Sequence, residues 1–241
     1  MKNLLTYVSP AKTFNAECQT LVKLQIDNSL ELGWRPEDIM LVTNFDYEYN
    51  GVRSIIIGDE NYCSFLPPTT KIYAIVALFE LGLIGDDLYW YHDFDTYQLN
   101  HIKWIRLKPE LRDGDIGISR YGQMPRLCSA SMFFRKSAQD IFVALKDYIK
   151  KVECDEETGL MRIINDNIVN SKSRVKLINM TYALHYFNLS TNVKLLHWPI
   201  KAVHAHPTPD KIDFFLHGKN KMNLIIFPER LIELFNKYGF T

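Results

Sequence analysis

Short apolar runs alternate along the chain with longer segments in which apolar residues recur at helical spacing. This alternation predicts an α/β protein with a central sheet flanked by helices. The runs expected to form strands are Asn3–Val8, Asp38–Phe45, Arg53–Gly58, Leu88–Asp93 and Cys128–Phe134, with one or two more strands in Val193–His206. The expected helices are Lys71–Leu83, Pro228–Tyr238, one capped by Ser137 and one opened by Asp155. No internal repeat or linker interrupts the pattern, which favours one domain over residues 1–241.

The first helix has the clearest periodicity. Its apolar positions recur every four residues and form one buried stripe, Phe14, Cys18, Val22, Ile26 and Leu30. We expect Ser9 to cap this helix, Pro10 to occupy its first turn and Gly33 to end it. Strand–helix units of this kind before residue 97 predict a parallel, Rossmann-like half, whose ligands bind beyond the carboxyl ends of the strands.

Composition narrows the class of protein. Hydrophobic residues make up 47% of the 241, enough for a full globular core. Lys plus Arg equals Asp plus Glu at 28 each, which argues against a dedicated nucleic-acid binder. No apolar run approaches the roughly 18 residues of a membrane span, and the one at the N-terminus is too short for a signal peptide. We therefore expect no transmembrane segment and a cytoplasmic location.

The cysteines agree with this location. The four, Cys18, Cys63, Cys128 and Cys154, stand far apart and form no CxxC pair, so we expect reduced thiols and no zinc site.

The strongest chemical signal is the acidic cluster that follows the aromatic run Leu88–His92. Alternate residues of an extended chain point to the same side, so Asp93 and Asp95 can converge on one cation while Phe94 turns into the core. Mg²⁺ and Mn²⁺ prefer oxygen ligands and bridge carboxylates to phosphate oxygens. A DxD triplet alone is common, but its place after an apolar strand in mid-chain favours a metal site that stabilises a departing diphosphate.

This arrangement resembles a GT-A glycosyltransferase with its DXD motif. The resemblance implies a GT-A mixed sheet in which residues 1–97 bind the nucleotide and residues 98–241 complete the metal and acceptor sites. It places Thr6, Tyr7 and Ser9 at the nucleoside, Asn44 and Asp46 in a base-reading loop, and Lys71 at the donor.

Two later segments resemble further motifs of this family. Cys128–Lys136 resembles the strand that borders donor sugar and acceptor, so Ser131 is expected at the donor, although Ser129 and Ser131 replace the usual Asn and Gly. Asp155 and Glu156 resemble an acidic helix start that supplies a catalytic base or a contact to a sugar hydroxyl.

The C-terminal part offers a third metal ligand. His204 and His206 share one face at the end of a strand, and neutral imidazole is a good ligand for Mn²⁺. The segment from His217 to Lys221 resembles the HxxGxxK motif of the glycogenin-like and galactosyltransferase group, with shortened spacing. The resemblance makes His217 an alternative ligand and places Lys219 and Lys221 at the diphosphate.

We therefore expect a metal-dependent glycosyltransferase that uses Mn²⁺ or Mg²⁺ and a nucleotide-sugar donor, UDP being the commonest nucleotide of DXD enzymes. The acceptor (a glycan, a lipid, a protein or a modified nucleic acid) and the choice between retention and inversion stay open.

Three alternatives are weighed against this expectation. A haloacid-dehalogenase-type phosphatase wants Thr or Val where Tyr97 stands, and a sugar nucleotidyltransferase wants glycines that Val8–Lys12 lacks. The third alternative is a non-catalytic nucleotide-sugar binding module.

Overall fold

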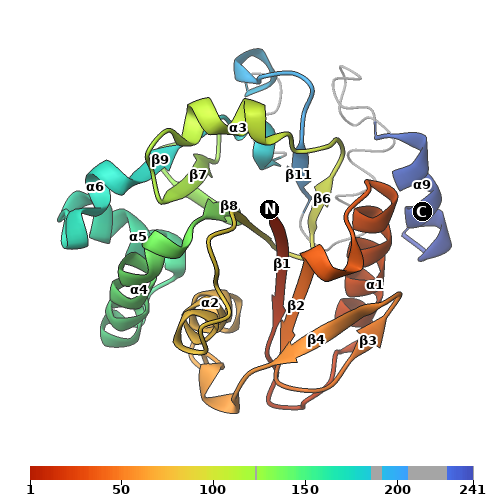
Figure 1. Cartoon of the computed structure of the whole chain (residues 1–241), viewed down its shortest axis with the longest axis horizontal. Helices are drawn as coiled ribbons and strands as arrows, with labels where there is room; N and C mark the ends of the chain where they lie inside the picture. Colours follow the sequence, from red (N-terminus) through yellow and green to blue (C-terminus); the bar gives the residue numbers. More distant parts are fainter. Residues whose placement is uncertain (123, 186–191, 206–226, 241) are drawn as a thin grey trace.

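The computed structural model describes residues 1–122, 124–185, 192–205 and 227–240. Within these ranges a mixed eight-stranded sheet has the order β3-β4-β2-β1-β5-β8-β7-β9 (Figure 1). Its strands are β1 (Lys2–Tyr7), β2 (Ile39–Thr43), β3 (Glu48–Tyr49), β4 (Val52–Ile56), β5 (Tyr89–His92), β7 (Ile116–Arg120), β8 (Leu127–Phe134) and β9 (Val175–Leu177). A second sheet contains β10 (Leu184–His185), β11 (Ala202–His204) and β6 (Thr96–Gln98).

Helices cover both faces of the large sheet (Figure 1). They are α1 (Ala16–Glu31), α2 (Thr70–Glu80), α3 (Trp104–Leu111), α4 (Gln139–Val152), α5 (Glu156–Asn165), α6 (Ser171–Arg174) and α9 (Glu229–Lys237). Alternate residues of β5 serve the two faces: Tyr89 and Tyr91 pack in the core with α2 and α4, and Trp90 packs in the core with α3. None of these helices has the length and apolarity needed to cross a membrane.

The order of strands places the acidic cluster. β1 pairs in parallel with both β2 and β5, so the carboxyl ends of these strands lie at one edge. β8 runs antiparallel to β5 with His92 opposite Ser131, and the Asp93 amide donates to the Ala130 carbonyl at 2.9 Å. This pairing brings residues near 129, far away in sequence, beside the residues that follow β5. The predicted mixed α/β sheet flanked by helices is thereby confirmed.

Two predicted helix caps are wrong. Helix α1 begins six residues later than expected, where the Asn15 side chain accepts the Cys18 amide at 2.7 Å. Ser9 instead begins a short turn in which its carbonyl accepts the Lys12 amide at 3.0 Å. A 3-10 turn over Lys136–Ala138 precedes α4, and the Ser137 hydroxyl donates to Asp115 rather than capping the helix.

The cap of α1 gives a prediction for stability. Replacing Asn15 by alanine is expected to lower the free energy of unfolding by about 1 kcal/mol, because the first turn loses its side-chain acceptor. Urea denaturation of the two proteins measures the difference. The control is Ser9→Ala, which removes only an exposed 3.3 Å contact to the Ala11 amide and is expected to change stability less. Equal effects of the two variants would contradict this account of the helix start.

Candidate functional site

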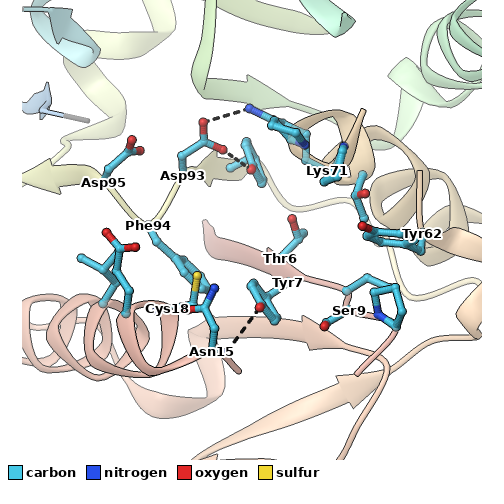
Figure 2. Close-up of a pocket in the computed structure, with 18 residues that line it drawn as sticks. Thr6, Tyr7, Ser9, Asn15, Cys18, Tyr62, Lys71, Asp93, Phe94 and Asp95 are labelled. Atoms are coloured by element: carbon cyan, nitrogen blue, oxygen red, sulfur yellow. Dashed lines mark hydrogen bonds and ion pairs between the residues drawn. The ribbon is translucent and has the colours of Figure 1, made fainter. Parts of the chain in front are cut away.

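A pocket of about 420 Å³ opens at the carboxyl ends of β1 and β5 (Figure 2). The end of β1 contributes Thr6, Tyr7 and Ser9 to its wall, and the start of α1 contributes Asn15 and Cys18. The opposite wall contains the turn after β5, the first residues of α2 and the 3-10 turn before α2, namely Asp93, Phe94, Asp95, Thr70, Lys71, Pro67 and Pro68. The pocket thus lies where an open α/β sheet binds its ligands.

The acidic triplet forms a tight turn. The Thr96 amide donates to the Asp93 carbonyl at 3.0 Å, so the extended backbone expected here is wrong. The two carboxylates still point to the same side of the turn, and Phe94 points the other way (Figure 2). Phe94 turns toward the core as expected and packs against it, but it stays half-buried, lines the pocket and stacks on Tyr7 with ring centroids 6.1 Å apart.

Buried polar groups hold this turn in place. The Gln25 amide of α1 donates to the carbonyls of Phe94 and Thr96 at 2.6 and 3.1 Å. The ring nitrogens of His92 lie 3.1 Å from the Asp93 carbonyl and 2.8 Å from Oδ1 of Asn3. Burial lowers the pKa of His92 to about 4, so its ring is neutral near pH 7. Because these partners fix the backbone of the turn, the directions of the two carboxylates are fixed as well.

His204 completes a group of three possible metal ligands. One ligand atom from each of Asp93, Asp95 and His204 lies within 4.8 Å of the other two. His204 ends β11, and its Nε2 lies 3.3 Å from Oδ2 of Asp95 while its Nδ1 lies 3.8 Å from the Cys128 thiol. Burial opposes protonation, but the neighbouring Asp95 carboxylate outweighs it and raises the pKa of His204 well above its usual value. Two carboxylates and an imidazole can hold a divalent cation, which would bind the ring in its neutral form.

Lys71 is the buried positive charge of the site. Its Nζ lies 2.9 Å from Oδ2 of Asp93 (Figure 2) and, outside the pocket, 3.0 Å from Oε1 of Glu156. Burial disfavours the ammonium form, but the two carboxylates outweigh it and raise the pKa of Lys71 well above its usual value. The Tyr91 hydroxyl donates to the other carboxylate oxygen of Asp93. Asp93 is thus oriented through both of its oxygens.

Glu156 pairs with Lys71 from inside the protein. Its carboxylate also accepts the hydroxyls of Thr69 and Ser129, each at 2.7 Å, and it is buried outside the pocket. Burial alone would raise its pKa, but the Lys71 charge and these hydrogen bonds lower it to about 2. Asp155 has a different role: it caps α5 by accepting the Thr158 amide at 2.7 Å. The catalytic roles expected for Asp155 and Glu156 stay predictions.

The low pKa of Glu156 gives a pH prediction. The pKa of Glu156 in the folded protein lies below the ordinary 4.5. The ion pair of Glu156 with Lys71 therefore stabilises the protein above pH 4.5, and this stabilisation is lost as the pH falls toward 2. The drop in pKa is worth about 3 kcal/mol at neutral pH. Urea denaturation at several pH values should therefore show a steeper loss of stability below pH 4.5 in the native chain than in Glu156→Gln. Parallel curves would contradict a buried ionised Glu156.

The other predicted site residues divide into those at the pocket and those away from it. Thr6, Tyr7, Ser9 and Lys71 line it with the two aspartates. Asn44 stands behind it and fixes Ser9, because its side chain accepts the Ser9 amide at 2.9 Å and donates to the Ser9 carbonyl at 2.8 Å.

Asp46 and Ser131 also lie outside the pocket. Asp46 is exposed opposite Arg53, with 3.7 Å between its Oδ1 and the Arg53 Nε. Ser131 is buried and accepts the Trp90 indole N–H at 2.9 Å. The predicted positions His206, His217, Lys219 and Lys221 lie outside the described residues.

Sequence reasoning missed several residues that shape the site. Tyr91 and Gln25 orient the acidic turn, and Cys128 contacts His204. Glu157 lies behind these residues, where its carboxylate accepts the Tyr121 hydroxyl at 2.8 Å and the Ser129 amide at 3.0 Å. The period-two pattern of β5 places Tyr91 on the same side as Asp93, a signal that could have revealed this residue. The other contacts join segments that are far apart in the chain.

Neither a protein-family model nor a curated protein sequence matches this chain. Solved structures do. The galactosyltransferase LgtC in complex with donor and acceptor sugar analogues is 14% identical, with a TM-score of 0.58 over 98% of this chain and 96% of that one. The glycosyltransferase GlyE of Streptococcus pneumoniae TIGR4 is 12% identical, with a TM-score of 0.56 over 98% of this chain and 64% of that one.

Mouse xyloside xylosyltransferase 1 is also similar. It is 12% identical, with a TM-score of 0.51 over 85% of this chain and 97% of that one. Identities this low establish likeness of fold and leave the activity to be argued from the site. With its mixed sheet, its pocket beyond the ends of β1 and β5 and its Asp93-Phe94-Asp95 turn, the chain has the GT-A fold of the nucleotide-sugar glycosyltransferases.

Proposed function

We propose that this chain is a metal-dependent glycosyltransferase that moves a sugar from a nucleoside-diphosphate donor to an acceptor hydroxyl. The observation that carries the proposal is the convergence of Asp93, Asp95 and His204 within 4.8 Å beside a pocket of about 420 Å³. A pocket of this size suits a small ligand. A divalent cation at its edge suits a ligand that carries a diphosphate.

The two sides of the pocket suit the two parts of such a donor. The nucleoside belongs against Tyr7, Phe94 and the end of β1, where aromatic rings offer a stacking surface. The diphosphate belongs at the acidic turn, which is the polar side of the same pocket. We therefore propose that residues 1–97 supply the nucleotide contacts and that residues 98–241 contribute the third ligand, His204, within a single domain.

Charge stabilisation is the chemistry that this arrangement supports. A bound Mn²⁺ or Mg²⁺ would stabilise the negative charge that builds on the leaving diphosphate. Lys71 and Tyr91 orient Asp93 in advance, and His204 lies 3.3 Å from Asp95, so little reorganisation is needed when the donor binds. Lys71 adds a buried positive charge that Glu156 holds in position. The geometry favours this positioning role for Glu156 over that of a general base, because a base must reach the proton that it takes.

The sequence does not favour the phosphatase alternative. That class has Thr or Val where Tyr97 stands, and Tyr97 is fully buried in the core. A non-catalytic binding module would hold the nucleotide sugar in the same pocket, so only a measurement of turnover distinguishes it from an enzyme.

The proposal is tested by thermal shift followed by turnover. UDP and other nucleoside diphosphates should raise the melting temperature only when Mn²⁺ or Mg²⁺ is present, because the cation joins protein to diphosphate. A panel of nucleotide sugars should then show metal-dependent release of the nucleotide. Metal-dependent stabilisation without turnover would favour the binding module, and hydrolysis of a generic aryl phosphate would favour the phosphatase. No metal-dependent stabilisation by any nucleotide would contradict the proposal.

A further inference from the structure

Large apolar side chains gather on the surface formed by α3, β9 and the segment that leads into β11. Ile105 is 77% exposed, Trp198 56% and Leu195 47%, and Trp104 and Leu177 are also exposed. Leu107 and Leu111 of the same helix are fully buried, so α3 has an apolar side in the core and further apolar residues in solvent. Exposed clusters of this kind mark interaction surfaces. We name these five exposed residues the α3 patch.

Hydrogen bonds join the segments of the α3 patch. The Arg106 guanidinium donates to the Trp198 carbonyl at 3.4 Å, and the Asn179 side chain donates to the Leu195 carbonyl at 2.9 Å. One hollow is lined by residues of α3 together with Leu177 and His197, and a neighbouring hollow is lined by Arg106, His197 and Trp198. Figure 1 shows α3 and the segment before β11 along the same rim of the molecule.

Positive charge surrounds the apolar residues. The exposed basic residues on these segments are Lys103, Arg106, Lys108, Arg112 and Lys194. The acids among them already have basic partners: Glu110 lies 3.2 Å from His197, and Asp113 lies 3.2 Å from Lys176. Since the whole chain has a formal net charge of zero, this local excess is a property of one face.

We propose that the α3 patch binds the surface of a membrane that contains anionic phospholipids. Trp side chains favour the boundary between headgroups and acyl chains, aliphatic side chains insert below it, and Lys and Arg meet lipid phosphates. A second copy of this chain fits less well, because a symmetric contact would bring the same basic side chains together. Nucleic acid fits less well because Ile105, Leu177 and Leu195 have no ring on which a base can stack.

Trp104, at the start of α3, lies at the other end of the central strands from the donor pocket. The Trp104 ring packs under Arg135, which follows the last residue of β8, Phe134. Phe134 pairs with Tyr89, the first residue of β5, whereas the acidic turn follows the last residue of β5. None of the five residues of the α3 patch lines the donor pocket, so membrane binding through the patch does not depend on the proposed function.

Vesicle sedimentation tests this proposal. We expect the whole chain to bind phosphatidylcholine vesicles that contain about 30% phosphatidylserine more tightly than vesicles without it, and to be released by about 0.5 M NaCl. The double variant Ile105→Ser, Trp198→Ser should lose binding by about tenfold or more. The matched control is Ile56→Ser, Leu81→Ser, which changes two residues of similar exposure on other elements and should bind normally.

Two further measurements keep the test decisive if the apolar variant folds poorly. Lys103→Gln with Lys108→Gln should weaken vesicle binding, whereas Lys150→Gln with Lys151→Gln on α4 should not. Brominated lipids should quench the fluorescence of Trp104 and Trp198, and replacing both by Phe should remove that quenching. Failure of the native chain to bind anionic vesicles would overturn the proposal. So would equal losses in patch and control variants, or a patch that mediates self-association or RNA binding instead.

Discussion

Replacing Asp95 by asparagine is expected to lower metal-dependent sugar transfer by about a thousandfold. The change keeps the shape of the side chain but removes the charge that Mn²⁺ or Mg²⁺ requires, and His204 and Asp93 alone make a weak site. A catalytic cation stabilises the transition state by several kcal/mol, and each 1.36 kcal/mol changes the rate by about tenfold. Steady-state kinetics with the donor found in the nucleotide-sugar screen measures the loss of turnover, and titration calorimetry measures the loss of Mn²⁺ affinity.

Asp46→Asn is the matched control for that variant. Asp46 is an exposed acid outside the pocket, so its neutralisation should leave both Mn²⁺ affinity and turnover within about twofold of the native values. If Asp95→Asn behaves like Asp46→Asn, the acidic turn does not hold a catalytic metal.

The second large effect is expected for Lys71→Met. This change leaves Glu156 ionised and buried without its cationic partner, which is expected to destabilise the fold by about 3–5 kcal/mol. The substitution also removes the ammonium group that orients Asp93 and supplies positive charge to the site. Sugar transfer should therefore fall as well. Urea denaturation and steady-state kinetics on the same preparation measure the two consequences.

A double variant separates stability from catalysis. Lys71→Met with Glu156→Gln removes both charges of the buried pair, and a neutral pair of similar volume is expected to recover most of the lost stability. Transfer should stay low, because the positive charge beside Asp93 is still missing. Native-like activity in the stable double variant would show that Lys71 is a structural residue only.

The fold could be predicted from the sequence for those segments whose pattern of apolar residues matches their burial in the structure. The β5 and β8 runs are buried on both faces, so they appear as mainly apolar segments without a polar alternation to solvent, and the acidic cluster follows the first of them directly. Helix starts were harder to predict. Ser9 and Asn15 are both residue types that cap helices well. In the structure the Asn44 side chain binds the amide and the carbonyl of Ser9 and holds Ser9 in a turn, so Asn15 caps the helix.

The partners of the site residues could not be predicted from local pattern. Lys71 and Glu156 are 85 positions apart, and they meet because α2 and α5 both approach the segment around Ser129. Cys128 reaches His204 only because β8 begins and β11 ends near the same turn. Such contacts depend on strand order and register, which an apolar run does not specify. The convergence of Asp93 with Asp95 was predicted, but on the wrong backbone, an extended segment where a turn is found.

Anomalous diffraction at the manganese edge, from crystals grown with MnCl₂ and UDP, tests the central claim most directly. We expect one strong peak among Asp93, Asp95 and His204, in contact with the diphosphate, with the nucleoside lying against Tyr7 and Phe94. The contradicting result is UDP bound in the crystal with no manganese peak at these three side chains.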